Sequence, residues 1–398
     1  MRRLGCLLLF VIMLISGCSC DNTEEYKKTS IFSSYIKGYL SKESTNYVNV
    51  EPFGTYISIV GYKEKEVAAL DGKLNSMINK YHSLLDRNYY YKDENGEFIN
   101  NITVINDSFG TGTPVVVDDI IIEILKEGIK YTKLSNGSFN IVSGSIVDVW
   151  DARFILFSNI YGIDPTEQEV LEGMKCVPSA SIIDSVLVID EENNTVTFNG
   201  FSGCNGKASI TLGALAKSFF LDKLVNDESF KNIGPAIYDA GQSSIIVRGE
   251  NPVRETGTWN IAIRNSLDGG YVGQLQLKEN ISVSTSSGDN KGYINESGVR
   301  RHHILDATTG YPNTYLLAAT VLGDSAMVVD IVTTTLLSMS NIEDIENYLI
   351  NLKNSGVNLR VLLQIEENDE LKALVNDEMK NVFVVSDGVL LEVFNYGA

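Results

Sequence analysis

One stretch, from Ile281 to Thr334, constrains the fold of this chain more than any other. It begins as a predicted strand and continues through two adjacent histidines at 302–303 and a turn-forming Gly-Tyr-Pro at 310–312. It ends in an apolar run at 326–337, which predicts a buried helix. So much polar chemistry between a strand and a buried helix indicates a functional site rather than a purely structural connection.

The polar residues of this predicted helix include Asp330 and Thr334. Because they lie one helical turn apart, both side chains would project from one face. A carboxylate and a hydroxyl on one face suit a hard cation such as Mg²⁺, which prefers oxygen ligands and keeps positions for water or substrate phosphates. The same pair also fits ordinary polar positions on a helix, so the metal site depends on the neighbouring motifs.

A second stretch, rich in small residues, runs from Ile210 to Lys217 and predicts a strand that passes into a helix over 216–224. Small residues permit close approach of the backbone, and a helix start presents N–H groups to an anion. Lys217 would add positive charge there; the alternative is a plain helix-packing motif. The Gly-rich segment 200–207 lacks P-loop spacing, and no Rossmann glycine pattern follows a strand, so neither nucleotide-binding class is supported.

The N-terminus predicts export and a lipid anchor. Residues 1–17 combine early arginines, a short apolar run and small residues, as in a secretory signal peptide. Cys18 follows Ile-Ser-Gly, which resembles a bacterial lipobox, so we expect Cys18 to be lipidated; the alternative is signal cleavage beside an unmodified cysteine. Residues 18–45 are polar and predict a tether, which leaves 46–398 as a domain held at the extracytoplasmic face of a bacterial membrane.

The net charge of the chain limits the classes of partner that the folded domain can bind. The formal net charge is −19, which argues against nucleic acid and against anionic lipid surfaces as partners of the folded domain. Any bound phosphate would need local help from a cation, a metal or helix N-termini.

The cysteines do not predict a zinc site, because they include no C-x-x-C pair and no cluster with histidine. Cys176 and Cys204 flank a predicted hairpin at 185–198. In an exported protein these two could form a disulfide, and the alternative is a pair of free thiols.

The remainder of the chain predicts strands grouped with helices, without a regular β-α-β repeat. This arrangement favours the α+β class, with a core large enough for two lobes. His82 falls on the apolar face of the first predicted helix, so we interpret it as structural. The predicted helices are 64–85, 117–131 and 342–352, and the predicted strands are 53–60, 236–249, 258–264, 274–277, 281–284, 358–364 and 382–386.

Several motifs, in order and spacing, point to a known family. They are Phe-Gly-Thr at 53–55, Asn-Gly-Ser-Phe-Asn at 136–140, Leu-Gly-Ala-Leu-Ala-Lys at 212–217, Ser-Gly-Asp at 287–289, His-His-Ile-Leu-Asp at 302–306, Thr-Gly-Tyr-Pro at 309–312, and Ser-Ala-Met at 325–327 with Asp330 and Thr334. Together they resemble the ApbE family of bacterial FAD:protein FMN transferases, often exported lipoproteins. The resemblance implies a two-lobed α+β fold with mixed or antiparallel sheets and flanking helices.

The resemblance also implies a reaction. With Mg²⁺, FAD is cleaved at its pyrophosphate, FMN passes to a threonine or serine of an exported or membrane-bound flavoprotein, and AMP is released. Asp330 and Thr334 would hold the metal with the carbonyl of Ala214. Asp330 would act in catalysis together with His303, a candidate base whose neutral imidazole could take the acceptor proton. The residues implied to line the FAD site are Phe53, Ser138, Phe139, Asn140, Thr211, Lys217 and Leu305.

Some positions depart from the pattern of the family. Asn140 and Thr211 stand where the family usually has aspartate, Asn290 and Arg301 where it usually has tyrosine, and residues 239–244 replace a Gly-Gly-Asp. The loss of two carboxylates at the nucleotide site could alter FAD affinity or turnover.

Three functions therefore stay open. The first is flavin transfer to a protein. The second is Mg²⁺-dependent FAD hydrolysis to FMN and AMP, with water as the acceptor. The third is a lipoprotein that binds FAD or another solute without catalysis, which the altered carboxylates at Asn140 and Thr211 would permit.

Overall fold

The computed structural model describes residues 27–396, apart from 45, 158–161, 232 and 290–291. The predicted signal peptide and Cys18 lie outside the described residues. Within these ranges, no helix combines the length and the apolar character that crossing a bilayer requires.

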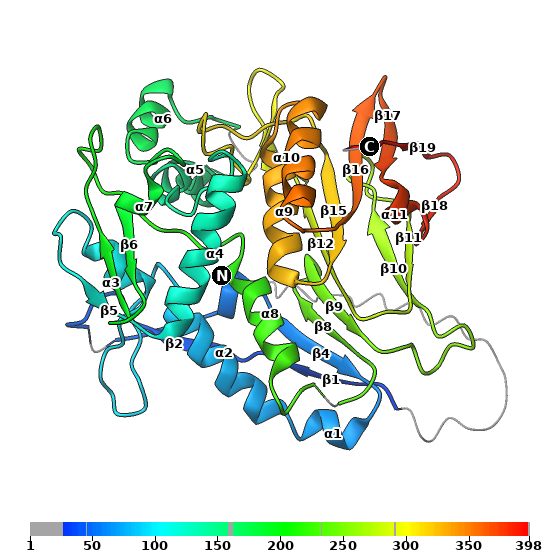
Figure 1. Ribbon diagram of the computed structural model, residues 1–398, viewed down its shortest axis with the longest axis horizontal. Coiled ribbons are helices and arrows are strands. Elements are labelled where there is room, and N and C mark those ends of the chain that lie inside the picture. The colour runs from blue at the N-terminus through cyan, green and yellow to red at the C-terminus, as the bar shows by residue number, and fades with distance from the viewer. Residues whose placement is uncertain (1–26, 45, 158–161, 232, 290–291, 397–398) are drawn as a thin grey trace, which may run out of the picture.

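One large sheet organises the described part of the chain (Figure 1). It has nine strands, in the order β1-β4-β8-β9-β12-β15-β16-β17-β19, and neighbours pair antiparallel except for β17 and β19 at one edge. The strands are β1 (Thr29–Phe32), β4 (Ile57–Gly61), β8 (Ala236–Ala240), β9 (Ser244–Arg248), β12 (Ile281–Ser287), β15 (Ala318–Gly323), β16 (Arg360–Glu367), β17 (Glu370–Val375) and β19 (Leu390–Val393).

Both faces of the central strands are covered, which explains why β15 is buried along its whole length. Helices α8 (Ala216–Asn226) and α9 (Ala326–Ser338) pack on one face, and α10 (Ile342–Asn354) follows α9. A second sheet packs on the other face through one apolar cluster that includes Trp259 and Leu275. That sheet consists of β10 (Trp259–Arg264), β11 (Tyr271–Leu277) and β18 (Phe383–Val385), with α11 (Asp377–Lys380) beside it.

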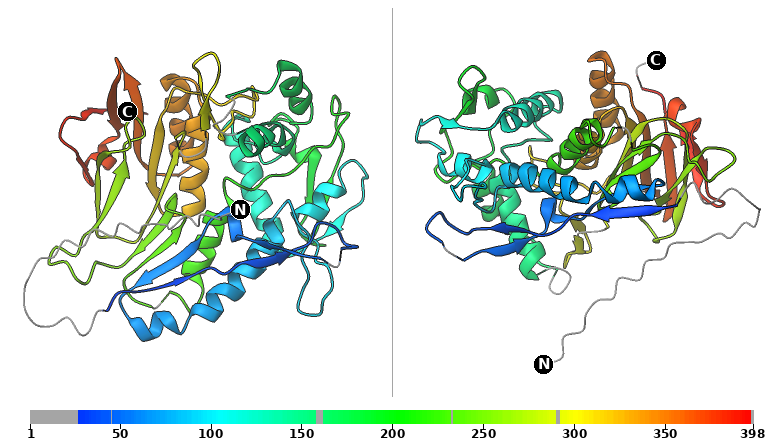
Figure 2. Two further views of the ribbon diagram at one scale, coloured as in Figure 1. Left: turned by 180° about the vertical axis from the view of Figure 1, so that it is seen from behind. Right: turned by 90° about the horizontal axis from the view of Figure 1, so that it is seen from below.

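A second lobe lies on the far side of α9 from β16 and β17, as Figures 1 and 2 show from front and back. It joins the first lobe through one continuous apolar core that includes residues of α4 and α9. Its elements are α3 (Ile102–Asp107), α4 (Asp119–Leu134), α5 (Gly144–Phe157), α6 (Glu167–Met174), α7 (Ile183–Val186) and a small sheet of β5 (Val115–Val116), β7 (Thr195–Phe198) and β6 (Leu187–Asp190).

The predicted hairpin at 185–198 is confirmed by the pairing of β6 with β7. Of the two alternatives left open for Cys176 and Cys204, the structure has the disulfide, with an S–S distance of 2.01 Å. The bond joins the segment after α6 to the Gly-rich loop at 200–207, which carries no strand after it. The strand predicted at Ile210 is therefore wrong, and the chain approaches α8 as an irregular segment.

The tether prediction for 18–45 is wrong from residue 29 onward. Thr29–Phe32 form β1, which pairs with β4 from Thr29↔Gly61 to Phe32↔Ser58. Ile36–Gly38 then form β2, which pairs with β3 (Val48–Val50). The folded region thus begins before residue 46, because the edge of the large sheet offers backbone partners to a short polar segment.

Two boundaries near the N-terminus also differ from prediction. The strand expected at 53–60 begins only at Ile57, because Pro52–Gly54 form the short 3₁₀ turn η1. The helix expected at 64–85 is divided into α1 (Glu64–Ala68) and α2 (Asp71–Leu85). The strand expected at 236–249 is divided into β8 and β9, which pair antiparallel around the turn at 241–243. The remaining predicted elements are present with small boundary shifts, and the α+β class is confirmed.

Candidate functional site

Helix α9 begins where polar groups can satisfy its first backbone N–H groups. Ser325 is the N-cap, and its hydroxyl accepts a 3.2 Å hydrogen bond from the N–H of Val328. The partly buried carboxylate of Asp222, on α8, accepts from the N–H groups of Ala326 and Met327 and from the Ser325 hydroxyl. The helix predicted at 326–337 is thus confirmed, and its start is fixed by α8.

The carboxylate of Asp330 is the point at which three elements meet. Lys217 Nζ lies 2.5 Å from Oδ2, and the Ser218 hydroxyl donates to the same oxygen at 2.8 Å. From β12, the Ser284 hydroxyl donates to Oδ1 at 3.0 Å. Since the Asp330 side chain is 3% exposed, these partners offset the cost of burying its charge.

The other two predicted metal ligands lie on α9 and just before α8. Thr334 lies one turn further along α9 and is partly exposed, and Ala214 lies just before α8, also partly exposed. Among the residues described, no group of three His, Cys, Asp or Glu side chains could hold a metal. One carboxylate with hydroxyl and carbonyl oxygens does not suit a soft metal, but it suits a hard cation that keeps water or phosphate ligands.

The Phe-Gly-Thr turn lies against α8. Phe53 has φ 56° and ψ 15°, a left-handed conformation that few non-glycine residues adopt. Its ring stacks on Phe220, with centroids 5.4 Å apart, one turn after Lys217 on α8. Its backbone N–H donates to Nδ1 of His82 at 3.1 Å. His82 is therefore a structural residue, as predicted, but one in direct contact with a predicted site residue.

The turn between β8 and β9 packs against the same Phe-Gly-Thr turn. Gly241 has φ 65°, and a Cβ atom there would lie 2.0 Å from Thr55 Oγ1, so only glycine fits. Asp239 Oδ1 accepts from the N–H of Gln242, and Oδ2 accepts from the Tyr56 hydroxyl at 3.2 Å. Burial, together with the Asp239 carboxylate, raises the pKa of Tyr56 to about 12.

The turn at 135–140 holds two other predicted site segments together. The carbonyl of Ser138 accepts from the N–H of Ala307, in the loop after the histidines. The carbonyl of Ile141 accepts from the N–H of Thr211 at 2.8 Å, before α8. These backbone bonds place the Ser-Phe-Asn, Thr211 and Ile-Leu-Asp segments next to one another.

Two predicted FAD residues in this turn have buried side chains. Phe139 belongs to the apolar core. The Asn140 amide donates to the carbonyl of Pro178 at 2.8 Å, and its oxygen accepts from the N–H of Val142. Both side chains therefore support the turn, whereas Ser138 is partly exposed.

The adjacent histidines occupy different environments. β13 (Gly292–Ile294) and β14 (Arg300–His302) form a hairpin, of which His302 is the last residue and which His303 follows. His302 is buried, its Nε2 lies 2.6 Å from the carbonyl of Asn313, and its Nδ1 accepts from the N–H of Ile304. Burial lowers the pKa of His302, so it is a neutral structural residue. His303 is exposed, as a candidate base must be.

The loop after His303 is a rigid turn. The carboxylate of Asp306 accepts from the N–H and the hydroxyl of Thr308, and the Trp150 indole donates to the carbonyl of Gly310 at 2.8 Å. Leu305 is partly buried and packs on the cluster that contains Trp150. The turn thus holds Leu305 beside the segment that Ser138 contacts.

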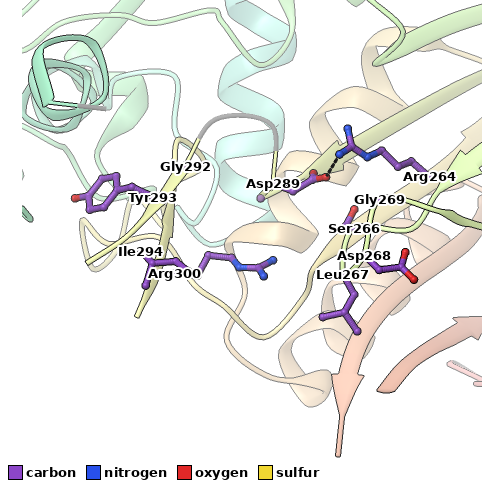
Figure 3. A pocket seen from close by; sticks show the side chains of 11 residues that line it. Arg264, Ser266, Leu267, Asp268, Gly269, Asp289, Gly292, Tyr293, Ile294 and Arg300 are labelled. Carbon is purple, nitrogen blue, oxygen red and sulfur yellow. Dashed lines mark ion pairs between the residues drawn. The ribbon is translucent and has the colours of Figure 1, made fainter. Parts of the chain in front are cut away.

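A cavity of about 400 Å³ opens beside the Ser-Gly-Asp motif (Figure 3). Arg264 pairs with Oδ2 of Asp289 at 3.4 Å, and no described residue forms a hydrogen bond with the buried Oδ1 of Asp289. Ser266, Asp268 and Arg300 also line the cavity. Ser266 and Asp268 lie in the β10–β11 turn, which carries no recognisable sequence motif, so their place beside the Ser-Gly-Asp motif was not predicted.

The sequence model of the ApbE family matches residues 53–357. This chain belongs to the ApbE family. Proteins named FAD:protein FMN transferase are among its relatives. The protein from Rhodobacter capsulatus is 25% identical over 58% of this chain, and the match spans 41% of the length of that protein. The protein from Vibrio cholerae is 27% identical over 57% of this chain, and the match spans 63% of its length. The protein from Haemophilus influenzae is 23% identical over 87% of this chain and 90% of its own length.

Solved ApbE structures share the fold. The flavin transferase ApbE from Vibrio cholerae superposes with a TM-score of 0.63 at 18% identity, covering 89% of this chain and 100% of that one. The ApbE protein from Thermotoga maritima gives 0.60 at 21% identity, covering 83% and 94%. The two-lobed α+β fold expected from the resemblance is thus the ApbE fold.

Within this ApbE family member, Arg301 has a clear structural partner. It pairs with Asp164 at 2.8 Å, and its guanidinium lies over the rings of Trp150 and Tyr311. Arg301 therefore ties the β13–β14 hairpin to the second lobe. Asn290, the neighbouring departure from the family pattern, lies outside the described residues.

The structure thus brings most of the predicted site residues onto neighbouring elements. Lys217 and Asp330 are in direct contact, and backbone bonds join the segments of Ser138 and Thr211. Ser218, Ser284 and Asp222 were not predicted. A hydroxyl or carboxylate on a strand or helix carries no local signal, so only the packing of α8, α9 and β12 reveals them.

Proposed function

We propose that this chain is a Mg²⁺-dependent FAD:protein FMN transferase. The observation that carries the proposal is the buried Asp330 carboxylate, which meets Lys217 from α8 and Ser284 from β12, one turn before Thr334. A buried acid paired with a lysine, one turn before a partly exposed threonine, suits the binding of a polyphosphate. The names of the relatives support the flavin substrate.

The oxygen donors fit the metal. Asp330, Thr334 and the carbonyl of Ala214 would hold Mg²⁺, which would neutralise the pyrophosphate charge that develops during transfer. Lys217 balances the charge of Asp330 at 2.5 Å and is 16% exposed, so its ammonium group can also face a phosphate.

The other predicted residues would bind the rest of FAD. The Phe53 ring, stacked on Phe220, offers an aromatic edge close to Lys217 along α8. Ser138 and Thr211 lie on adjacent segments and are partly exposed, so their hydroxyls can reach a ligand. Phe139 and Asn140 would act by shaping the turn, because their side chains are buried.

The acceptor hydroxyl would lose its proton near His303. In the transfer step, the acceptor oxygen forms a bond to the phosphorus of the FMN half, the pyrophosphate bond breaks, and AMP leaves with the bridging oxygen. The exposed imidazole of His303 would take the hydroxyl proton, while the buried His302 fixes the backbone next to it. Phosphoryl transfer depends mainly on positioning and charge neutralisation, which Lys217 and Asp330 would supply.

A labelling assay tests the proposal. Purified protein is incubated with FAD, Mg²⁺ and an exported flavoprotein acceptor, and AMP release and in-gel flavin fluorescence are followed. Covalent fluorescence on the acceptor that disappears with EDTA is the expected result. AMP and free FMN without labelled protein would indicate a pyrophosphatase. Retained FAD without either product, across several acceptors, would indicate a binding protein.

We also propose that the chain is exported and anchored to a membrane through a lipid on Cys18. The support is the lipobox-like sequence before Cys18. The Cys176–Cys204 disulfide adds to it, since disulfides persist mainly in oxidising compartments. Mass spectrometry of the mature N-terminus tests this proposal: a diacylglycerol-modified cysteine is expected, and an unmodified N-terminus would rule the anchor out.

A further inference from the structure

A buried chain of hydrogen bonds ends at the backbone of Phe53. The N–H of Phe53 donates to His82 Nδ1 at 3.1 Å, and His82 Nε2 lies 3.1 Å from the Tyr91 hydroxyl. That hydroxyl donates to Asp86 Oδ2 at 2.5 Å. His82, Asp86 and Tyr91 are all buried, so water does not compete for these bonds.

The donors and acceptors in this chain allow one arrangement of protons. A backbone N–H can only donate, so His82 Nδ1 must carry a lone pair and the imidazole is neutral with its proton on Nε2. Tyr91 gives its own proton to Asp86, so its oxygen accepts from His82 Nε2–H. The Asp86 carboxylate thereby selects, through Tyr91, the tautomer of His82 that can hold Phe53.

The backbone conformation of Phe53 is unfavourable unless other residues stabilise it. Phe53 adopts φ 56°, which costs free energy for a side chain with a Cβ, and such conformations persist where the surroundings enforce them. The His82 ring also contacts the Phe53 ring edge-on, with centroids 5.2 Å apart. His82 therefore constrains both the backbone and the ring of Phe53, and the Phe220 ring also stacks on the Phe53 ring.

We infer that His82 is a positioning residue for FAD binding, which holds the Phe53 turn in its left-handed conformation through the Nδ1 lone pair. The inference rests on the proposed function, in which the Phe53 ring lines the FAD site. Asp86 and Tyr91 act one step further away, by setting the tautomer. A change that removes the Nδ1 acceptor releases Phe53, even when the ring volume is largely replaced.

Two substitutions of His82 distinguish its hydrogen bond to Phe53 from its contribution to packing. In His82→Asn the side-chain oxygen can occupy the place of Nδ1 and accept from Phe53. In His82→Gln the amide reaches the place of Nε2 and Tyr91 instead, so the Phe53 N–H loses its acceptor. We expect the Kd and the KM for FAD to rise about tenfold in His82→Gln and less than about threefold in His82→Asn, with kcat within about threefold in both.

The opposite pattern, or equal effects of both substitutions on FAD binding, would overturn the inference, because a purely structural histidine would not favour the Nδ1 mimic. FAD binding by the unaltered protein is measured alongside. If that protein fails to bind FAD, the proposed function fails instead, and the tautomer measurement described next still decides whether His82 holds Phe53.

The tautomer can be measured without any ligand. The chain has three histidines, so long-range ¹H–¹⁵N spectra of histidine-labelled full-length protein can be assigned by substitution. We expect the His82 ring to show a protonated Nε2 and an unprotonated Nδ1 at neutral pH. A protonated Nδ1, as in the other tautomer or in the imidazolium ion, would exclude the bond to Phe53 and overturn the inference. Because this measurement uses the unaltered protein, it decides the question even if the His82 variants do not fold.

Discussion

The backbone N–H of Ala326 donates a 2.8 Å hydrogen bond to the carboxylate of Asp222. Asp222 lies on α8 and Ala326 is the first residue of α9, so one helix caps the other. Because α8 also carries Lys217 and α9 carries Asp330, this cap sets the relative position of the two charges at the candidate site. The N-terminus of a helix favours a negative charge, which suits the position of the Asp222 carboxylate at the start of α9.

Removal of this cap is expected to lower stability. Asp222→Ala leaves the N–H groups of Ala326 and Met327 without their acceptor, so the free energy of unfolding should fall by about 2 kcal/mol. Urea unfolding followed by circular dichroism measures the change. The matched control is Glu343→Ala, an exposed acid in the first turn of α10, which should change stability by less than about 0.5 kcal/mol. Equal effects of the two substitutions would contradict the capping role.

Asp330→Asn should abolish flavin transfer. The substitution removes the charge that pairs with Lys217, and the labelling rate should fall by about 10²-fold or more. It also leaves a mostly buried ammonium group without its anion, which should cost about 3 kcal/mol of stability. The assay is run where circular dichroism shows the variant folded. Asp324→Asn, on an exposed residue before α9, is the control, and full activity in Asp330→Asn would refute the role.

Stability should fall as the pH drops below neutrality. Burial lowers the pKa of His82 and His302 below the ordinary 6.5. Between the lowered pKa and 6.5 the unfolded chain binds more protons than the folded one, so acid favours unfolding. The two residues together can contribute a slope of at most about 2.7 kcal/mol per pH unit.

Urea unfolding between pH 7.5 and about 5 measures that slope. His302→Gln removes one titrating group and should reduce the slope, whatever its effect on stability at pH 7.5. A slope that stays the same in this variant would show that His302 does not titrate differently in the folded and unfolded states.

Reduction of the disulfide should destabilise the protein. Cys176 and Cys204 are separated by 28 residues, and release of that loop should lower the free energy of unfolding by about 3–4 kcal/mol. Urea unfolding with and without a thiol reductant tests this. A Cys176→Ser/Cys204→Ser variant should match the reduced protein and show no response to reductant; a response would indicate an effect elsewhere.

Elements with strong local patterns could be predicted from the sequence. The apolar run at 326–337 and the hairpin at 187–198 gave nearly correct bounds, because their periodicity and turn residues act locally. β1 was missed because four residues of mixed polarity carry no such signal, and its stability comes from the ladder it shares with β4. The interruption between α1 and α2 was also missed, because neither Ala69 nor Leu70 is a helix-breaking residue.

The candidate site was predictable where residue type determines the chemistry. Asp330, Thr334 and Lys217 stood out because charges and hydroxyls among apolar residues are costly. The partners of Asp330 were not predictable, because Ser218 and Ser284 meet it only after α8, α9 and β12 pack. The burial of Phe139 and Asn140 was also hidden, since a motif in a turn does not indicate which side chains point inward.

The pairing of β1 with β4 bears on how this protein can be shortened. A truncation at residue 46, the domain boundary that the sequence predicts, would strip β1 from the sheet and uncover the backbone N–H and C=O groups of Ile57 and Ile59. An uncovered edge of a large sheet recruits strands from other molecules. Such a fragment would therefore self-associate, whereas a fragment that begins before Thr29 keeps β4 paired and leaves the short strand β1 at that edge of the sheet.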